Sequence, residues 1–227
     1  MRILIIKTSS LGDVIHALPA LEYLLQAAPG ATVDWVVDEA FAELLAGNPL
    51  INRLLLVAFR RWKKSPFVRQ TRSEILQFVA TLRQEPYDLV FDLQGNIKSG
   101  LVCALSRAPV KIGFSKAHQQ ERLNGLFTNR KVGFLPSDRN AAQRYLRVVS
   151  APFTLPLESV EPHSDIHTGG GDDTYAQQVV ERAAGQPLIL FHNGTTWTTK
   201  LWYGDGWKQL ADALLLRYPQ ATILLSW

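Results

Sequence analysis

Apolar positions along the chain fall into two patterns, short continuous runs and longer helical periodicities. The first run, residues 3–6, predicts a strand that is buried on both faces, as in a parallel sheet. A polar stretch follows, and apolar side chains then recur at helical spacing over residues 12–27. The chain therefore opens with a strand, a polar loop and a helix, which together form one βα unit.

The same alternation of strand and helix continues to residue 150. We expect further strands at residues 32–37, 53–57, 87–93 and 110–114, and helices at residues 39–46, 67–83, 97–106 and 139–150. Repeated βα units predict the α/β class, with a doubly wound parallel sheet. Ligands of such sheets bind outside the carboxyl ends of the strands. The loops after the strands are therefore the places to search for chemistry.

Prolines and glycines interrupt residues 151–173, which we interpret as a connection between domains. A second unit follows, with helices expected at residues 174–184 and 204–217 and strands at residues 188–191 and 222–226. We therefore place a first domain at residues 1–165 and a second at residues 166–227. Because two parallel strands cannot form a covered sheet alone, we expect the second domain to be incomplete in this chain.

The composition of the 227 residues is that of an ordinary globular protein, with 47% hydrophobic and 19% charged residues. A single cysteine excludes an internal disulfide and suits a reducing compartment. The N-terminal apolar run is too short for a signal peptide or a membrane span, so a cytoplasmic location is expected. A net charge of +4 is only a slight indication of an anionic partner.

The basic charge is concentrated in one segment, because no acidic residue lies between Glu43 and Glu74. The segment includes two aromatic residues, Trp62 and Phe67. Its basic residues are Arg53, Arg60, Arg61, Lys63, Lys64, Arg69 and Arg72. Such a stretch is either a solvated surface or a site for a polyanion, such as nucleic acid, anionic lipid or a charged sugar.

The loop after the first strand, residues 7–13, contains one cation, three hydroxyls and one carboxylate. Ser10 and Asp13 are three residues apart, which suits a capping pair at the start of the following helix. Alternatively, Asp13 acts as a general base on a sugar hydroxyl. Gly12 is the only glycine in this loop, so the glycine-rich dinucleotide fingerprint is absent, which counts against a dehydrogenase.

A second candidate loop, residues 192–203, lies between a predicted strand and a predicted helix. Its hydroxyls, including Thr195 and Thr196, and its cation Lys200 suit phosphate binding, although a polar surface loop has the same composition. Two other segments give less specific signals. Residues 92–99 either add polar contacts at a strand end or cap a helix. Residues 163–167 have a His/Asp alternation that metals use, but they lie in the predicted connection between domains, and a solvated segment is the favoured interpretation.

Taken together, these motifs resemble the lipopolysaccharide heptosyltransferases of type I, the ADP-heptose:LPS heptosyltransferase family. The specific match is residues 7–19, with the sequence KTSSLGDVIHALP. Residues 92–99 (DLQGNIKS), 129–131 (NRK) and 195–202 follow in the same order. The resemblance implies the GT-B architecture, in which two Rossmann-like domains face a cleft. It also implies an inverting glycosyltransferase that moves L-glycero-D-manno-heptose from ADP-heptose to a Kdo residue of the lipid A inner core.

The resemblance also assigns roles to residues. The first domain would bind the acceptor, with Asp13 as the general base. The second would bind the nucleotide sugar, with Lys200 neutralising the leaving diphosphate and Thr195 and Thr196 near that phosphate. Acceptor contacts would come from Lys7, Ser10, Arg60, Arg61, Lys63 and Lys64. No metal or other cofactor is implied, since ADP-heptose is a substrate and a lysine with helix-start amides can stabilise the leaving group.

Location and partners follow from the same resemblance. The acceptor lies on the inner face of the inner membrane, so we expect a cytoplasmic, peripheral protein whose Trp62 and Phe67 touch the membrane surface. Carboxylates and phosphates of the acceptor explain the basic segment better than nucleic acid does. The family's Asp-Thr-Gly-type donor loop is not in this sequence, so we expect an incomplete donor site and little or no activity of this chain. A related transferase with another donor or acceptor, or a non-catalytic binder of anionic glycolipid, remains an alternative.

Overall fold

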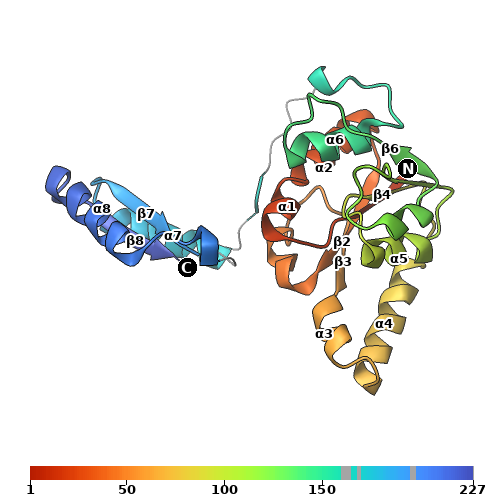
Figure 1. Cartoon of the computed structure of the whole chain (residues 1–227), viewed down its shortest axis with the longest axis horizontal. Helices are drawn as coiled ribbons and strands as arrows, with labels where there is room; N and C mark the ends of the chain where they lie inside the picture. The colour runs from red at the N-terminus through yellow and green to blue at the C-terminus, as the bar shows by residue number, and fades with distance from the viewer. Residues whose placement is uncertain (160–164, 168–169, 195–197, 227) are drawn as a thin grey trace. The chain divides into compact units, whose positions relative to one another are not determined.

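The computed structural model describes residues 1–159, 165–167, 170–194 and 198–226. The chain divides into two compact units, Met1–His167 and Thr168–Trp227. The domain boundary predicted after residue 165 lies two residues before the boundary between these units. Each unit is a separate α/β body with its own parallel sheet, in agreement with the predicted fold class (Figure 1).

The first unit is built on a six-stranded sheet with the order β3-β2-β1-β4-β5-β6, in which every neighbouring pair is parallel. The strands are β1 (Arg2–Ile6), β2 (Thr32–Asp38), β3 (Arg53–Val57), β4 (Leu89–Asp92), β5 (Val110–Phe114) and β6 (Arg130–Val132). The strand order reverses direction between β1 and β4, so their carboxyl ends form the topological switch point of the sheet. Only the three-residue strand β6 was absent from the sequence prediction.

The helices of this unit occupy the predicted connections. They are α1 (Leu11–Ile15), α2 (Leu18–Ala27), α3 (Phe59–Lys64), α4 (Arg69–Leu82), α5 (Ile97–Leu105) and α6 (Ala141–Ser150), with 3₁₀ turns η1 (Glu39–Leu44), η2 (Arg122–Leu126) and η3 (Leu157–Ser159). The single helix expected over residues 12–27 is two helices. Pro19 explains the break, because its ring would clash with the carbonyl of Ile15 in a continuous helix.

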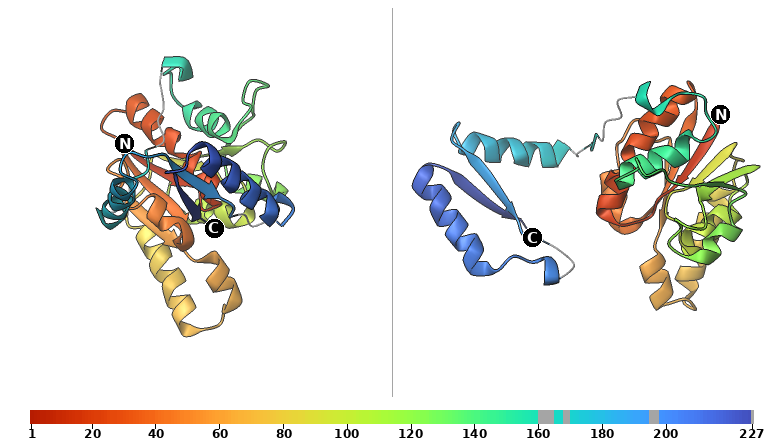
Figure 2. Two further views of the ribbon diagram at one scale, coloured as in Figure 1. Left: turned by 90° about the vertical axis from the view of Figure 1, so that its left-hand side faces the viewer. Right: turned by 45° about the horizontal axis from the view of Figure 1, so that its top comes forward.

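Helix α3 is a further element that the sequence pattern missed. Its six residues, with the sequence FRRWKK, are too few to show a helical period. Packing stabilises it instead, since Trp62 lies edge-on to Phe59 and also contacts Phe78 of α4. Together α3 and α4 form a two-helix protrusion beyond the end of β3 (Figures 1 and 2).

Both faces of the sheet are buried, as the continuous apolar strands predict. Alternate residues of β1 point to opposite sides, with Ile3 and Ile5 in one core cluster and Leu4 and Ile6 in the other. The first cluster includes side chains of α1, α2 and α6, whereas the second includes side chains of α4 and α5. This packing fixes the ends of the strands, from which the candidate site is built.

The second unit has a two-stranded parallel sheet of β7 (Leu188–His192) and β8 (Thr222–Ser226), with α7 (Gly170–Arg182), η4 (Thr198–Lys200) and α8 (Gly204–Arg217). Helix α7 begins four residues before its predicted start. Trp207 of α8 packs against Phe191 and Trp202, with ring centroids 5.1 and 5.0 Å apart. Gly206 lies close to this cluster, and a Cβ there would lie 2.8 Å from the Tyr203 ring, so a side chain would displace that ring.

None of the helices in the described part of the chain has both the length and the apolar character needed to span a bilayer.

Candidate functional site

The candidate site lies at the switch point of the first unit, where the loops after β1 and β4 meet. Gln94, which follows β4, accepts hydrogen bonds from the backbone amides of Thr8 and Ser9 at 3.1 and 3.0 Å. The Thr8 hydroxyl donates to the same Gln94 oxygen at 3.3 Å. One buried amide side chain therefore joins the two loops and fixes the path of the chain that leads to Asp13.

The loop after β4 is itself fixed by Asp92, whose side chain is fully buried. Its carboxylate accepts hydrogen bonds from the backbone amides of Gln94 and Gly95, from the Ser99 hydroxyl and from the Asn124 amide. Burial raises the pKa of Asp92, although these four donors oppose the shift. Asp92 is therefore a structural centre of the loop, and it is not accessible to a substrate.

Asp13 lies on the first turn of α1, with a side chain that is 37% exposed. Its Oδ2 accepts hydrogen bonds from the backbone amide and the hydroxyl of Ser10, at 3.2 and 3.0 Å. The capping contact predicted from the spacing is therefore present. Its Oδ1 accepts a hydrogen bond from the Tyr145 hydroxyl at 3.3 Å. Capping and catalysis do not exclude each other, because the carboxylate remains partly open to solvent.

Lys7 lies behind Asp13 and has a side chain that is only 1% exposed. Its Nζ is 3.9 Å from Oδ2 of Asp13 and 4.9 Å from the centre of the Tyr145 ring. A buried ammonium beside a carboxylate and over an aromatic face is stabilised by both. Because Nζ is enclosed, Lys7 positions Asp13 from inside the protein. Direct contact with an acceptor, which the resemblance implied for Lys7, does not fit this burial.

For both Lys7 and Asp13, the charge of the partner shifts the pKa in one direction and burial shifts it in the other. Burial lowers the pKa of Lys7 to about 8, while the carboxylates of Asp13 and Asp92 oppose that shift. Burial acts to raise the pKa of Asp13, but the Lys7 charge and the hydrogen bonds from Ser10 and Tyr145 outweigh it, and the net pKa is lowered. Asp13 is therefore ionised at neutral pH, as a proton acceptor must be.

Replacing Lys7 with methionine is expected to raise the pKa of Asp13, because burial then acts without the opposing charge. Carbon-detected NMR titration of the side-chain carboxyl measures this shift directly. Lys116→Met, at an exposed lysine, is the control and is expected to leave the Asp13 titration in place. An unchanged Asp13 titration in Lys7→Met would show that the ammonium does not act on this carboxylate.

Lys7→Met is also expected to change how the free energy of unfolding depends on pH. The pKa of Lys7 is about 8 in the folded protein and 10.5 as the ordinary value, so the unfolded chain binds more protons between these values. The Lys7 contribution to the free energy of unfolding therefore rises as pH increases from 8 to 10.5. The unfolding free energy of the wild type minus that of Lys7→Met, from urea titrations at pH 7.5 and 9.5, is expected to increase with pH. A constant difference would contradict it.

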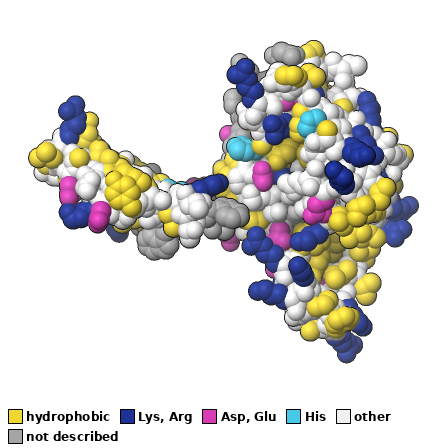
Figure 3. Space-filling view, in the orientation of Figure 1, with side chains coloured by type: hydrophobic (Ala, Val, Ile, Leu, Met, Phe, Trp, Pro, Cys, Tyr) yellow, Lys and Arg dark blue, Asp and Glu magenta, His cyan; other side chains and the backbone are white. Residues whose placement is uncertain are grey.

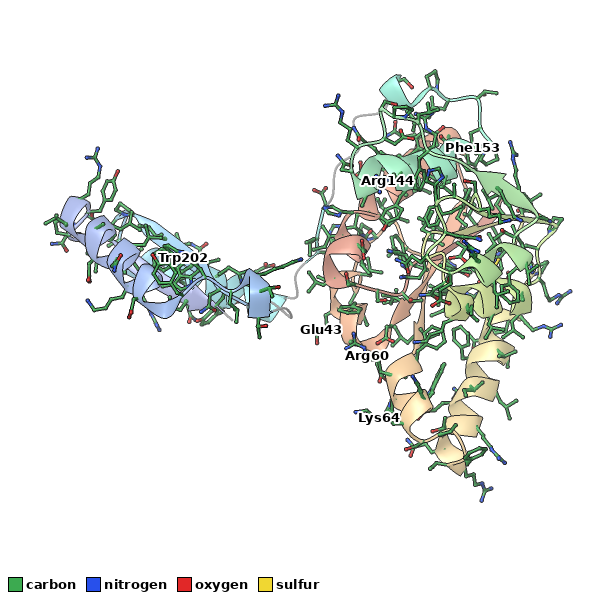
Figure 4. The ribbon with its side chains drawn as sticks, in the orientation of Figure 1. Glu43, Arg60, Lys64, Arg144, Phe153 and Trp202 are labelled. Atoms are coloured by element: carbon green, nitrogen blue, oxygen red, sulfur yellow. The ribbon has the colours of Figure 1, made fainter. Side chains whose placement is uncertain are left out.

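The basic segment has no acidic residue in its sequence, but the fold brings acidic side chains next to it. The Arg61 guanidinium binds Glu39 at 2.9 Å and Glu74 at 2.6 Å, which joins α3 to η1 and α4. Arg61 was predicted to face an anionic acceptor, but its charge is already shared by two carboxylates. Arg60, Lys63 and Lys64 are exposed, and no ion pair joins them to another described residue. Figure 4 marks Arg60 and Lys64 on α3.

The two aromatic residues of this segment differ in exposure. Phe67, between α3 and α4, is 83% exposed. Trp62 is half-buried, and its Nε1 donates a hydrogen bond to Glu74 at 2.8 Å. Phe67 is therefore the more exposed of the two aromatic residues, whereas Trp62 packs between α3 and α4 and leaves only part of its ring open.

A polar pocket of about 550 Å³ lies beyond the carboxyl end of β5. His118, Arg139 and Arg144 contribute its basic groups, and the Arg144 guanidinium lies 5.3 Å from the centre of the Phe134 ring. Arg144 belongs to α6, where Figure 4 labels it. The carboxylate of Asp138 also lines this pocket, and it pairs with Arg147 at 3.1 Å. The guanidinium groups of Arg139 and Arg144 suit a carboxylate or a phosphate.

In the second unit, the predicted phosphate loop follows β7 and leads into η4. Lys200 ends η4, and its side chain is exposed. Thr195 and Thr196 lie outside the described residues, as does His163 of the His/Asp alternation. The other two members of that alternation, Asp165 and His167, lie in the described segment 165–167 and line a small pocket with Leu18 and Asn48.

Sequence reasoning did not identify Tyr145, and it included Gln94 only as a member of the strand-end loop 92–99, without its contact to the loop after β1. Tyr145 is 132 residues from Asp13 and belongs to the buried face of α6, where a tyrosine in a helical pattern indicates only core. Gln94 carried a usable signal, since it directly follows a strand next to the one that precedes Asp13. Its bonding to Thr8 and Ser9 depends on β1 and β4 being neighbours, which the local pattern does not specify.

Comparison with protein-family models matches residues 75–227 to glycosyltransferase family 9 (heptosyltransferase). A lipopolysaccharide heptosyltransferase 1 from Pseudomonas aeruginosa is 36% identical over 219 residues, which cover 96% of this chain and 59% of that protein. The protein of the same name from Escherichia coli K12 is 35% identical over 94% of this chain and 65% of its own length. The chain thus spans 59% and 65% of these two relatives.

Among solved structures, the E. coli heptosyltransferase WaaC with ADP matches the whole chain with a TM-score of 0.77 and 33% identity. The match covers 68% of that protein. WaaC with ADP-2-deoxy-2-fluoro heptose gives a TM-score of 0.79 and covers 69%. These likenesses agree with the motifs from which the resemblance was drawn.

Proposed function

Since the chain belongs to glycosyltransferase family 9, the heptosyltransferases, we propose that it transfers L-glycero-D-manno-heptose from ADP-heptose to the Kdo of the lipid A inner core, with inversion. The observation that carries the proposal is the geometry of Asp13. It is ionised and partly exposed at the switch point of the sheet, and Lys7 and Tyr145 hold it in place. The names of the relatives and the nucleotide-sugar analogue bound to WaaC support the choice of donor.

The proposed chemical step is a single displacement. The acceptor hydroxyl oxygen attacks the anomeric carbon of the heptose while the bond from that carbon to the ADP oxygen breaks. The hydroxyl proton passes to Asp13, and the electron pair of the broken bond goes to the diphosphate. A carboxylate of low pKa suits this role, since the hydroxyl becomes acidic only as the new bond forms.

On the donor side, we assign Lys200 to the leaving diphosphate, where an ammonium stabilises the negative charge as it develops. Thr195 and Thr196 are assigned to the same phosphates as hydroxyl donors. The start of α8, only a few residues later, adds backbone amides suited to an anion. With these groups the proposed step uses no metal and no further cofactor.

On the acceptor side, Ser10 and the exposed cations Arg60, Lys63 and Lys64 are assigned to the anionic saccharide. Arg61 instead holds α3 in place through Glu39 and Glu74. The proposed location is cytoplasmic, peripheral at the inner face of the inner membrane, with exposed Phe67 at the lipid surface. Nucleic acid is not a proposed partner, because a carboxylated and phosphorylated lipid satisfies the same cations.

The test is a transfer assay with the full-length protein, ADP-heptose and defined acceptors. Kdo-bearing lipid A is expected to be heptosylated, as followed by mass spectrometry and ADP release. An acceptor that already carries the first heptose is the control and is expected to react far more slowly. Turnover only on the heptosylated acceptor would identify a related transferase. Binding of lipid A without any turnover would instead favour a non-catalytic glycolipid-binding protein.

A further inference from the structure

An apolar groove of about 330 Å³ lies beside the α3–α4 protrusion, against α5. Its wall is formed mainly by Phe59, Trp62, Ile75, Phe78, Leu101 and Leu105. Two lysines, Lys63 and Lys98, complete the lining, and none of the described residues that line it is acidic. The groove therefore combines a hydrocarbon interior with positive charge.

Several apolar side chains around this groove are exposed to solvent. Leu101 is 50% exposed and Ile75 is 37% exposed, and neighbouring Leu76 on α4 is 69% exposed. Hydrophobic side chains gather over α4 and α5 in Figure 3, with Lys and Arg side chains beside them. A contiguous apolar surface of this kind marks an interaction site more often than a solvated face.

The acidic side chains and the lysines near the groove lie on different sides of Trp62. On one side of its ring, Glu39 and Glu74 neutralise Arg61. On the groove side, Lys98 Nζ lies 5.8 Å from the centre of the Phe59 ring, and Lys63 is exposed. The acids of the region are thus occupied away from the groove, and its lysines are left to attract an anion.

The position of the groove links it to the candidate site. Phe59 follows the carboxyl end of β3, and Lys98 lies in the first turn of α5, just beyond the carboxyl end of β4. Both therefore belong to the sheet edge that also carries Asp13. From there the groove extends along α5 to Leu105, away from that edge.

We propose that this groove binds one acyl chain of an anionic membrane lipid, with Lys63 and Lys98 at the lipid phosphate. A volume of about 330 Å³ lies at the lower end of the usual range for small-molecule pockets, which suits one chain. The two lysines favour a ligand with an anionic headgroup. An apolar helix of a protein partner would fill the groove but would leave the lysines without a counter-charge. The site goes beyond the proposed transfer, since it holds a membrane lipid whether or not that lipid is the acceptor. Lys63, which is also assigned to the acceptor saccharide, is then shared by the two sites, whereas Lys98 belongs to the groove alone.

The test uses vesicles of phosphatidylglycerol and phosphatidylethanolamine with brominated acyl chains, which quench nearby tryptophans. No Kdo lipid and no ADP-heptose are present, so transferase chemistry does not enter. Emission of the wild-type chain is expected to be quenched, and Trp62→Phe is expected to lose the quenched component. Trp35 is fully buried and serves as an internal reference that bromine does not reach. Asp13→Asn is expected to bind these vesicles as the wild type does, which separates this site from the proposed function.

Leu101→Glu places a charge in the groove at a half-exposed position, so the fold tolerates it, and vesicle partitioning is expected to fall about tenfold or more. The matched control is Leu216→Glu on α8, at a leucine that is 86% exposed. Lys63→Glu with Lys98→Glu is expected to abolish the preference for phosphatidylglycerol over neutral vesicles. Equal partitioning of Leu101→Glu and its control would overturn the proposal. Quenching that persists in Trp62→Phe, or equal binding to neutral vesicles, would overturn it as well.

Discussion

Replacing Asp13 with asparagine is expected to lower the rate of heptose transfer by about 10²- to 10⁴-fold, the usual contribution of a general base. Asparagine has the same shape and can still accept a hydrogen bond from Ser10, but it cannot take up a proton at neutral pH. The loss should therefore appear in kcat, with acceptor binding retained, because only the transition state needs the base. Transfer kinetics of the full-length protein with Kdo-bearing lipid A measure both quantities.

The alternative for Asp13 is a purely capping role, and the two roles differ in what the variant loses. Loss of the cap, as in Asp13→Ala, costs about 1 kcal/mol of stability, and a residue that only caps leaves turnover almost unchanged when it is lost. Asp38→Ala is the matched control, since Asp38 ends β2 at the same sheet edge and its carboxylate accepts a hydrogen bond from the Ala40 amide. If Asp13→Ala and Asp38→Ala lose similar stability and both keep full turnover, Asp13 is a cap and the proposed mechanism fails.

Local patterns were sufficient to predict five of the six strands in the sheet of the first unit, because these strands are apolar runs that are buried in a parallel sheet. They did not predict β6 or the order of the strands. The position of Asp13 followed for the same reason, since a polar loop between a buried strand and a helix can only lie at the sheet edge. The boundaries of helices were less predictable. The division between α1 and α2 depends on one proline, and α3 is stabilised by Trp62 rather than by any period of its own.

Contacts between distant segments are what the sequence could not supply. Arg61 belongs to a stretch without acids, but the fold brings Glu39 and Glu74 to it from both directions along the chain. Tyr145 reaches Asp13 only because α6 packs on the same face of the sheet as α1. Both cases depend on tertiary neighbours, which neither composition nor spacing encodes. The assignments of Lys200, Thr195 and Thr196 still rest on the motif resemblance.

Replacing Lys200 with methionine is expected to lower kcat by about 10²- to 10³-fold, as removal of one group that stabilises transition-state charge does. Methionine retains much of the aliphatic stem but removes the ammonium that the leaving diphosphate needs. Lys208→Met is the matched control, because Lys208 is an exposed lysine on nearby α8 whose charge is shared with Asp212 at 2.7 Å. The control is expected to keep nearly full activity, and Lys200→Arg to recover part of the loss, since arginine keeps the charge with a different geometry.

If Lys200 stabilises the leaving group, a second result is expected that simple binding of the donor does not predict. If Lys200 acts on developing charge, the loss in Lys200→Met should shrink for a donor analogue with a less basic leaving phosphate, because that group needs less stabilisation. Binding of ADP should also weaken in the variant, as measured by calorimetry on the full-length protein. An equal loss with both donors would assign Lys200 to holding the ground state. Unchanged kcat and unchanged ADP affinity would remove it from the donor site, and the charge that accumulates on the diphosphate would then require another cation of the second unit.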